Sequence, residues 1–141
     1  MVRILVALDE SQGSEKALEA AVKLAQFDGG QVTAVTVLER TGDPHLDRLA
    51  ECVKDQALGR LDELLQTAAN FARSRGVQLL PVMREGHPAD TIIACAEAEK
   101  ADLVVVGSNG ASHERRGLGA ISDLVSSHCP CNVLIVKSGG C

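Results

Sequence analysis

The chain is almost without aromatic side chains. It contains no Trp and no Tyr, and its two Phe residues are Phe27 and Phe71. Proteins that bind single-stranded nucleic acid or quaternary ammonium groups stack their ligands on aromatic rings. The composition therefore argues against both kinds of site, and it predicts a core filled by aliphatic side chains.

Basic charge and long apolar runs are also scarce. The 14 Lys and Arg residues against 19 Asp and Glu residues give a net charge of −5, which offers little attraction to nucleic acid or anionic lipid. The apolar runs Leu103–Val106 and Val133–Val136 are far shorter than the roughly 18 residues of a membrane helix. No secretory signal pattern precedes the apolar residues that follow Arg3. We therefore expect a cytoplasmic protein that binds neither nucleic acid nor membrane.

The cysteines form no pattern of a known structural site. They are few, odd in number and irregularly spaced, at Cys52, Cys95, Cys129, Cys131 and Cys141. Neither a disulfide framework nor a four-ligand zinc site has this spacing. The segment Cys129-Pro130-Cys131 also lacks the Cys-x-x-Cys spacing of redox motifs. We expect reduced thiols, with this pair packed as small buried hydrophobes.

What the sequence does contain is an alternation of short β-branched runs with longer helical patterns. At 141 residues the chain has the length of a single domain, residues 1–141. The alternation is typical of a parallel sheet with helices on its faces. The expected strands are Ile4–Leu8, Val32–Leu38, Val77–Val82, Leu103–Val106 and Val133–Val136.

Four helices are expected between these strands. The first covers Ser11–Phe27, and the last covers Ala120–His128. Apolar residues from Leu46 to Ala72 recur at helical spacing, which predicts one long helix weakened at Gly59. Pro88 suits the first turn of the remaining helix, where a missing N–H donor costs nothing.

Right-handed crossovers with one reversal of winding give an open, doubly wound, five-stranded parallel sheet of order 3-2-1-4-5. Strand three lies at an edge in this order, which suits Pro81. Ligands bind such sheets where the order reverses, here between the first and fourth strands. The loops that follow Leu8 and Val106 should therefore meet at a crevice.

The connection from Gly107 to Gly119 is much longer than an ordinary loop between a strand and a helix. Its glycines allow backbone N–H groups to approach an anion, and the next helix contributes unpaired N–H groups at its N-terminus. Arg115 and Arg116 could neutralise a phosphate. The competing interpretation is a flexible surface loop with solvated arginines. The position of this connection at the reversal of strand order favours binding instead.

Four segments together resemble a small, single-domain member of the universal stress protein family, and the resemblance covers essentially the whole chain. They are Ile4–Asp9 with Ser11 and Ser14, Glu85–Pro88, Ala101–Gly110 and Cys129–Val136. The resemblance implies the fold of adenine nucleotide alpha hydrolases. It also implies a loop of pattern Gly-x2-Gly-x9-Gly-Ser/Thr in the branch of the family that binds ATP.

The chain departs from that loop pattern. Gly107 and Gly110 match its first half, but residues 111–118 place eight positions before Gly119 instead of nine, and Ala120 replaces the Ser or Thr. Losing that hydroxyl donor predicts weaker binding of ATP, alone or with Mg²⁺. The residues expected to bind the nucleotide are Ala7, Leu8, Asp9, Val37, Val106, Gly107, Asn109, Gly110, Arg115, Arg116, Gly119, Ala120 and Ile121.

The resemblance places Asp9 near the ribose and the backbone of Val37 near adenine, whereas the sequence alone also permits Asp9 to cap the first helix. The sequence shows no activated nucleophile and no acid–base pair, so we expect a protein that binds or senses an adenine nucleotide and is not an enzyme. One alternative is a dimeric interaction module that binds no nucleotide and pairs through Val133–Val136. Another is a slow ATPase that orients water with His113.

Overall fold

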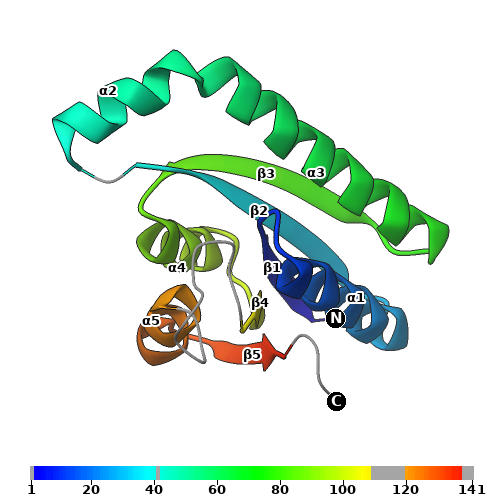
Figure 1. Ribbon diagram of the computed structural model, residues 1–141. Helices are drawn as coiled ribbons and strands as arrows, with labels where there is room; N and C mark the ends of the chain where they lie inside the picture. The colour runs from blue at the N-terminus through cyan, green and yellow to red at the C-terminus, as the bar shows by residue number, and fades with distance from the viewer. Residues whose placement is uncertain (1, 41, 109–119, 138–141) are drawn as a thin grey trace.

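Five parallel strands form the centre of the molecule. The computed structural model describes residues 2–40, 42–108 and 120–137. The strands are β1 (Arg3–Leu8), β2 (Gln31–Glu39), β3 (Leu79–Gly86), β4 (Leu103–Gly107) and β5 (Asn132–Val136). Their order is β3-β2-β1-β4-β5, as Figure 1 shows, which confirms the predicted topology.

Helices cover both faces of this sheet. They are α1 (Gln12–Asp28), α2 (Pro44–Cys52), α3 (Lys54–Ser74), α4 (Pro88–Ala98) and α5 (Ala120–His128). Helices α1 and α3 pack on one face, and α4 and α5 pack on the other. Because α1 follows β1 and α5 follows β4, the chain leaves these adjacent strands toward opposite faces. The reversal of winding therefore lies between β1 and β4, as predicted.

The core contains aliphatic side chains on both faces of the sheet, as the composition predicts. Val6 and Val105 belong to the cluster under α1 and α3, whereas Leu5 and Val104 belong to the cluster under α4 and α5. All four side chains are fully buried. Successive residues of β1 and β4 thus alternate between two cores, which is why these strands are continuous apolar runs.

The prediction of one long helix after Pro44 is wrong. The helical segment breaks at Val53 into α2 and α3, and the predicted weak point, Gly59, lies within α3. The second half of the apolar stripe is buried at Leu61, Leu65, Ala68 and Ala72. The first half is exposed at Leu46, Leu49 and Val53, and α2 has no buried residue. With no core beneath α2, the periodicity of its apolar residues does not hold it in line with α3.

Polar contacts hold α2 instead, and Arg40 is at their centre. The Arg40 guanidinium pairs with Glu85 at the end of β3 and with Glu51 on α2, the latter at 2.8 Å. Lys54 lies 3.6 Å from Glu85 and 3.8 Å from Glu51. In Figure 1, α2 lies away from the strands, and this network links it to the end of β3 at the carboxyl edge of the sheet.

The Arg40 network predicts a pH-dependent contribution to stability. The hydrogen bond from Arg40 holds the pKa of Glu85 below its ordinary value of 4.5. A carboxylate with a lowered pKa stabilises the fold above its unfolded pKa and loses that effect as the pH falls through the folded pKa. We therefore expect Arg40→Met to lower the urea midpoint at pH 7, and this difference should shrink progressively as the pH falls from about 4.5 through the lower pKa of Glu85 in the fold. Arg48→Met, on the exposed surface of α2, is the control and should leave the midpoint unchanged at both pH values.

Candidate functional site

The candidate site lies at the carboxyl ends of β1 and β4. The two strands pair in parallel register, with Val6 beside Val105. Leu8 ends β1 and Gly107 ends β4, so the segments that follow them leave the same edge of the sheet. This is the predicted location of the crevice.

The turn after β1 is stabilised by three hydrogen bonds to side-chain oxygens. Asp9 Oδ1 accepts a 2.8 Å hydrogen bond from the N–H of Ser11, and the Asp9 N–H donates to Ser14 Oγ at 2.8 Å. Ser11 is the N-cap of α1, and its Oγ accepts from the Ser14 N–H at 3.2 Å. Asp9 therefore stabilises the turn that precedes the helix, while Ser11 caps the helix itself. The half-buried Asp9 is held in a defined position beside the end of β1.

The first turn of α1 and the end of β4 approach each other closely through two glycines. A Cβ atom at Gly107 would lie 2.7 Å from the carbonyl oxygen of Gly13 and 2.8 Å from its carbonyl carbon. Real Cβ atoms do not approach backbone atoms this closely, so only glycine fits at position 107 in this arrangement. The backbone at the carboxyl end of β4 is therefore without a side chain where the winding reverses.

The neighbouring strand β2 contributes the third side of the site. Thr36 is buried, and its hydroxyl donates a 3.0 Å hydrogen bond to the carbonyl oxygen of Leu8. Val37, the next residue, is half-buried near the carboxyl end of β2. Thr36 thus fixes the end of β1 relative to β2, and Val37 lies on the edge where the family resemblance places adenine.

The site continues toward α5. Helix α5 begins at Ala120, as predicted, and Ile121 is half-buried against the core cluster under α4 and α5. Val106 is buried in the same cluster. The predicted phosphate-binding residues between the two elements lie outside the described residues; they are Asn109, Gly110, Arg115, Arg116 and Gly119.

The structure adds residues to the site that the sequence analysis did not identify. Gly13 supplies the backbone that meets Gly107, and Thr36 supplies the contact to Leu8. Ser108 is buried, and its N–H extends the β4–β5 ladder by donating to the Val136 carbonyl oxygen at 2.9 Å. A glycine in the first turn of a helix, as in Ser11-Gln12-Gly13-Ser14, was a usable signal for Gly13. A buried Thr in a strand gave no comparable signal.

The described part of the chain offers no cluster of metal ligands and no membrane-spanning helix. Across residues 2–40, 42–108 and 120–137, no three His, Cys, Asp or Glu side chains gather closely enough to hold a metal ion. Within the same residues, no helix has the length and apolar character needed to cross a membrane.

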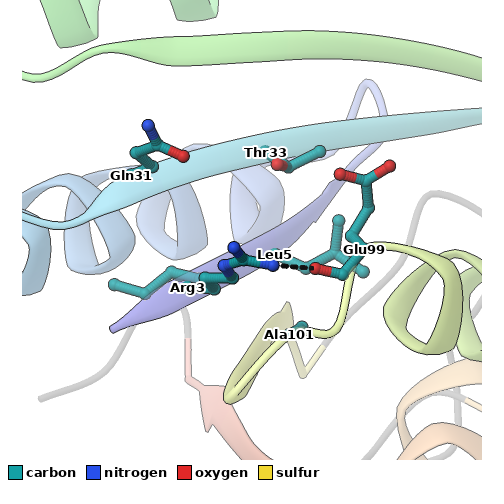
Figure 2. A pocket seen from close by; sticks show the side chains of 7 residues that line it. Arg3, Leu5, Gln31, Thr33, Glu99 and Ala101 are labelled. Atoms are coloured by element: carbon teal, nitrogen blue, oxygen red, sulfur yellow. Dashed lines mark hydrogen bonds between the residues drawn. The ribbon is translucent and has the colours of Figure 1, made fainter. Parts of the chain in front are cut away.

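A separate hollow lies at the opposite, amino-terminal edge of the sheet. It has a volume of about 220 Å³, and the labelled side chains around it include Arg3, Thr33 and Glu99, as Figure 2 shows. The Arg3 guanidinium there donates to the Glu99 carbonyl oxygen at 3.5 Å. Because this hollow involves the first residues of β1 and the segment before β4, it is distinct from the candidate site.

Comparisons with known proteins agree with the fold. The model of the universal stress protein family matches residues 1–137. Universal stress protein YxiE of Bacillus subtilis is 34% identical over 96% of this chain and 98% of its own length. UspA from Lactobacillus plantarum superposes with a TM-score of 0.86 at 27% identity, covering 96% of this chain and 97% of UspA.

One further solved structure bears on ligands. It is a universal stress protein in complex with cAMP, with a TM-score of 0.77 at 26% identity, covering 98% of each chain. The matches extend over nearly the whole sequence and over nearly the whole length of these relatives. The chain described here belongs to the universal stress protein family.

Proposed function

We propose that this protein binds an adenine nucleotide at the carboxyl edge of β1 and β4. The observation that carries the proposal is the close approach of Gly107 to Gly13, which brings the first turn of α1 against the carboxyl end of β4 at the reversal of winding. Reversal points are the usual ligand sites of doubly wound sheets. The similarity to a family member in complex with cAMP supports an adenine nucleotide as the ligand.

Each side of the site has a proposed role. Asp9, fixed by its hydrogen bond from Ser11, binds the ribose, and the backbone of Val37 binds the adenine. Backbone N–H groups at the start of α5 and in the glycine-containing loop bind the phosphates, helped by the positive end of the helix dipole. The ligand is ATP, alone or with Mg²⁺, and Arg115 and Arg116 neutralise its charge. The protein acts by binding or sensing the nucleotide and not by turning it over.

Two measurements test this proposal. In the first, purified protein is denatured and its supernatant is analysed for adenine nucleotides. In the second, ligand-free protein is titrated with ATP by calorimetry. Released nucleotide or a saturable heat supports the proposal. The absence of both signals at millimolar ATP would overturn the proposal and leave the interaction module as the better interpretation.

The substitution Ala120→Ser tests the weakened loop. Restoring a hydroxyl donor at the start of α5 should gain about 1.5–3 kcal/mol of interaction with a charged phosphate oxygen, or roughly tenfold or more in affinity. Ala94→Ser, at an exposed position of α4, is the matched control and should leave the ATP affinity unchanged. An unchanged affinity in Ala120→Ser would show that the shorter loop, not the missing hydroxyl, limits binding.

We also propose that two copies of the chain form a symmetric dimer through β5. This strand lies at the edge of the sheet, and Leu134 within it is 38% exposed. An apolar edge strand is prone to pair with another strand. If the chain binds no nucleotide, this dimer is the basis of its alternative role as an interaction module.

A further inference from the structure

The segment between α5 and β5 brings two thiols together. Cys129 follows the last residue of α5, and Cys131 precedes the first residue of β5, with Pro130 between them. Their Sγ atoms are 3.6 Å apart. The sequence predicts small buried hydrophobes here, but both side chains are partly exposed to solvent. The thiols therefore face each other where a soluble reagent can reach them.

The spacing of the two cysteines along the chain is compatible with a disulfide. Two residues that are two positions apart have Cα atoms no more than roughly 7 Å apart, and disulfides accept about 4.4–6.8 Å. The chain bends at Pro130 and at Cys131, which shortens that distance. The sulfur atoms need to close from 3.6 Å to about 2 Å, a change within the reach of side-chain rotation.

The surroundings allow the ring to close without moving the neighbouring elements. The Cys129 N–H donates to the Val125 carbonyl oxygen at 2.9 Å, which continues the hydrogen bonding of α5. Both side chains are partly buried and pack against the core cluster under α4 and α5. Because both residues lie outside α5 and β5, we expect ring closure to leave these two elements in place.

We propose that Cys129 and Cys131 form a reversible intramolecular disulfide by exchange with a low-molecular-weight disulfide such as oxidised glutathione. One cysteine thiolate attacks the glutathione disulfide, forms a mixed disulfide and releases one glutathione thiolate. The second cysteine thiolate then attacks the protein sulfur of the mixed disulfide and releases the other glutathione. The protein loses two electrons and two protons, and oxidised glutathione becomes two molecules of reduced glutathione.

The state of the thiols sets how fast this exchange runs. Burial, together with the neighbouring Cys129 thiol, raises the pKa of the Cys131 thiol from 9.0 to about 11. Since only the thiolate attacks, a raised pKa slows exchange near neutral pH. The rate of ring closure should therefore rise with pH through the alkaline range.

The test uses residues 1–141 with Cys52→Ser and Cys141→Ser, which leaves the pair and the buried Cys95. After incubation with oxidised glutathione, intact mass spectrometry should show the loss of two hydrogens and no glutathione adduct. Reduced glutathione in excess should restore the original mass. Adding Cys129→Ser or Cys131→Ser to this background should stop the reaction at one glutathione adduct, whereas adding Cys95→Ala should leave the loss of two hydrogens intact.

Two results would overturn the proposal. In the first, the chain with Cys52→Ser and Cys141→Ser does not close the ring. It either accumulates the glutathione adduct or stays unmodified under conditions in which the exposed Cys52 of the wild-type chain takes up glutathione. In the second, Cys95→Ala abolishes the loss of two hydrogens, which would assign the bond to the buried thiol. Neither readout depends on nucleotide binding, so the thiol pair and the proposed function are tested separately.

Discussion

Replacing Gly107 with alanine is expected to lower the free energy of unfolding by about 1–3 kcal/mol and the affinity for ATP by roughly tenfold or more. The new Cβ atom would lie 2.7 Å from the carbonyl oxygen of Gly13. That oxygen belongs to the backbone of α1, so no side-chain rotation relieves the overlap. Either β4 or the first turn of α1 has to move.

The displacement would act on the site because the same turn of α1 holds Asp9. Ser14, the residue after Gly13, accepts the hydrogen bond from the Asp9 N–H, and Ser14 is itself buried. A shift of this turn moves Asp9 relative to the end of β1 and β4. Urea unfolding measures the loss of stability, and calorimetric titration measures the loss of affinity.

Gly59→Ala is the matched control for Gly107→Ala. Gly59 lies within α3, and a Cβ atom there would meet nothing within 4 Å. Alanine is the better helix former by roughly 0.5–1 kcal/mol, so this variant should be slightly more stable than the wild type with unchanged ATP affinity. If Gly107→Ala unfolds at the same urea concentration as the wild type and binds ATP equally well, the close approach of β4 to α1 has no role in the site.

The sheet could be predicted from the sequence because its three inner strands, β1, β2 and β4, are largely buried, and the edge strands β3 and β5 are short apolar runs that are partly buried. Val104 and Val105 alternate between two cores, and such strands are recognisable as short apolar runs separated by helical patterns. The position of β3 at an edge also followed, since Pro81 is tolerated there. Strand order then followed from the handedness of crossovers.

Helix α2 could not be predicted because its contacts are not periodic. The apolar stripe of Leu46, Leu49 and Val53 has helical spacing but faces no core, and all three side chains are about half exposed. The interactions that place α2 are ion pairs from Arg40, whose partners Glu51 and Glu85 are distant from each other in the sequence. A periodic pattern of apolar residues predicts an amphipathic helix, but it does not indicate whether the apolar face packs against a core.

The location of the candidate site could be predicted from the sequence, but the contacts between its distant residues could not. Its location at β1 and β4 follows from topology, and Asp9 and Gly107 follow from their place at the strand ends. The contact between Gly13 and Gly107 joins residues distant in the sequence, and a single glycine in a helical turn does not indicate its partner. The hydrogen bond from Thr36 to Leu8 could not be predicted for the same reason, because it depends on the parallel pairing of β1 and β2.

The two edges of the sheet differ in ways that favour β5 over β3 as the interface of the proposed dimer. The β3 edge carries Pro81, which cannot donate a hydrogen bond, and the charged residues Arg84 and Glu85. Proline and charge at an edge discourage pairing with another chain. The β5 segment Asn132–Val136 contains neither proline nor charge. Of these two strands, β5 is therefore the one suited to pair with a second copy.

We expect the wild-type protein to have the mass of a dimer by light scattering at micromolar concentration, and Leu134→Lys to have the mass of a monomer. Leu134 is 38% exposed on β5, so a lysine there places two like charges across a symmetric interface. Removing these two charged groups from water adds a further free-energy cost to dimer formation. Leu80→Lys is the matched control, because Leu80 is 54% exposed on the other edge strand, β3, and this variant should remain a dimer. A monomeric wild type would refute the dimer. Dissociation by Leu80→Lys alone would instead assign the interface to β3, because only the strand at the interface brings its lysine close to the same residue of the second copy.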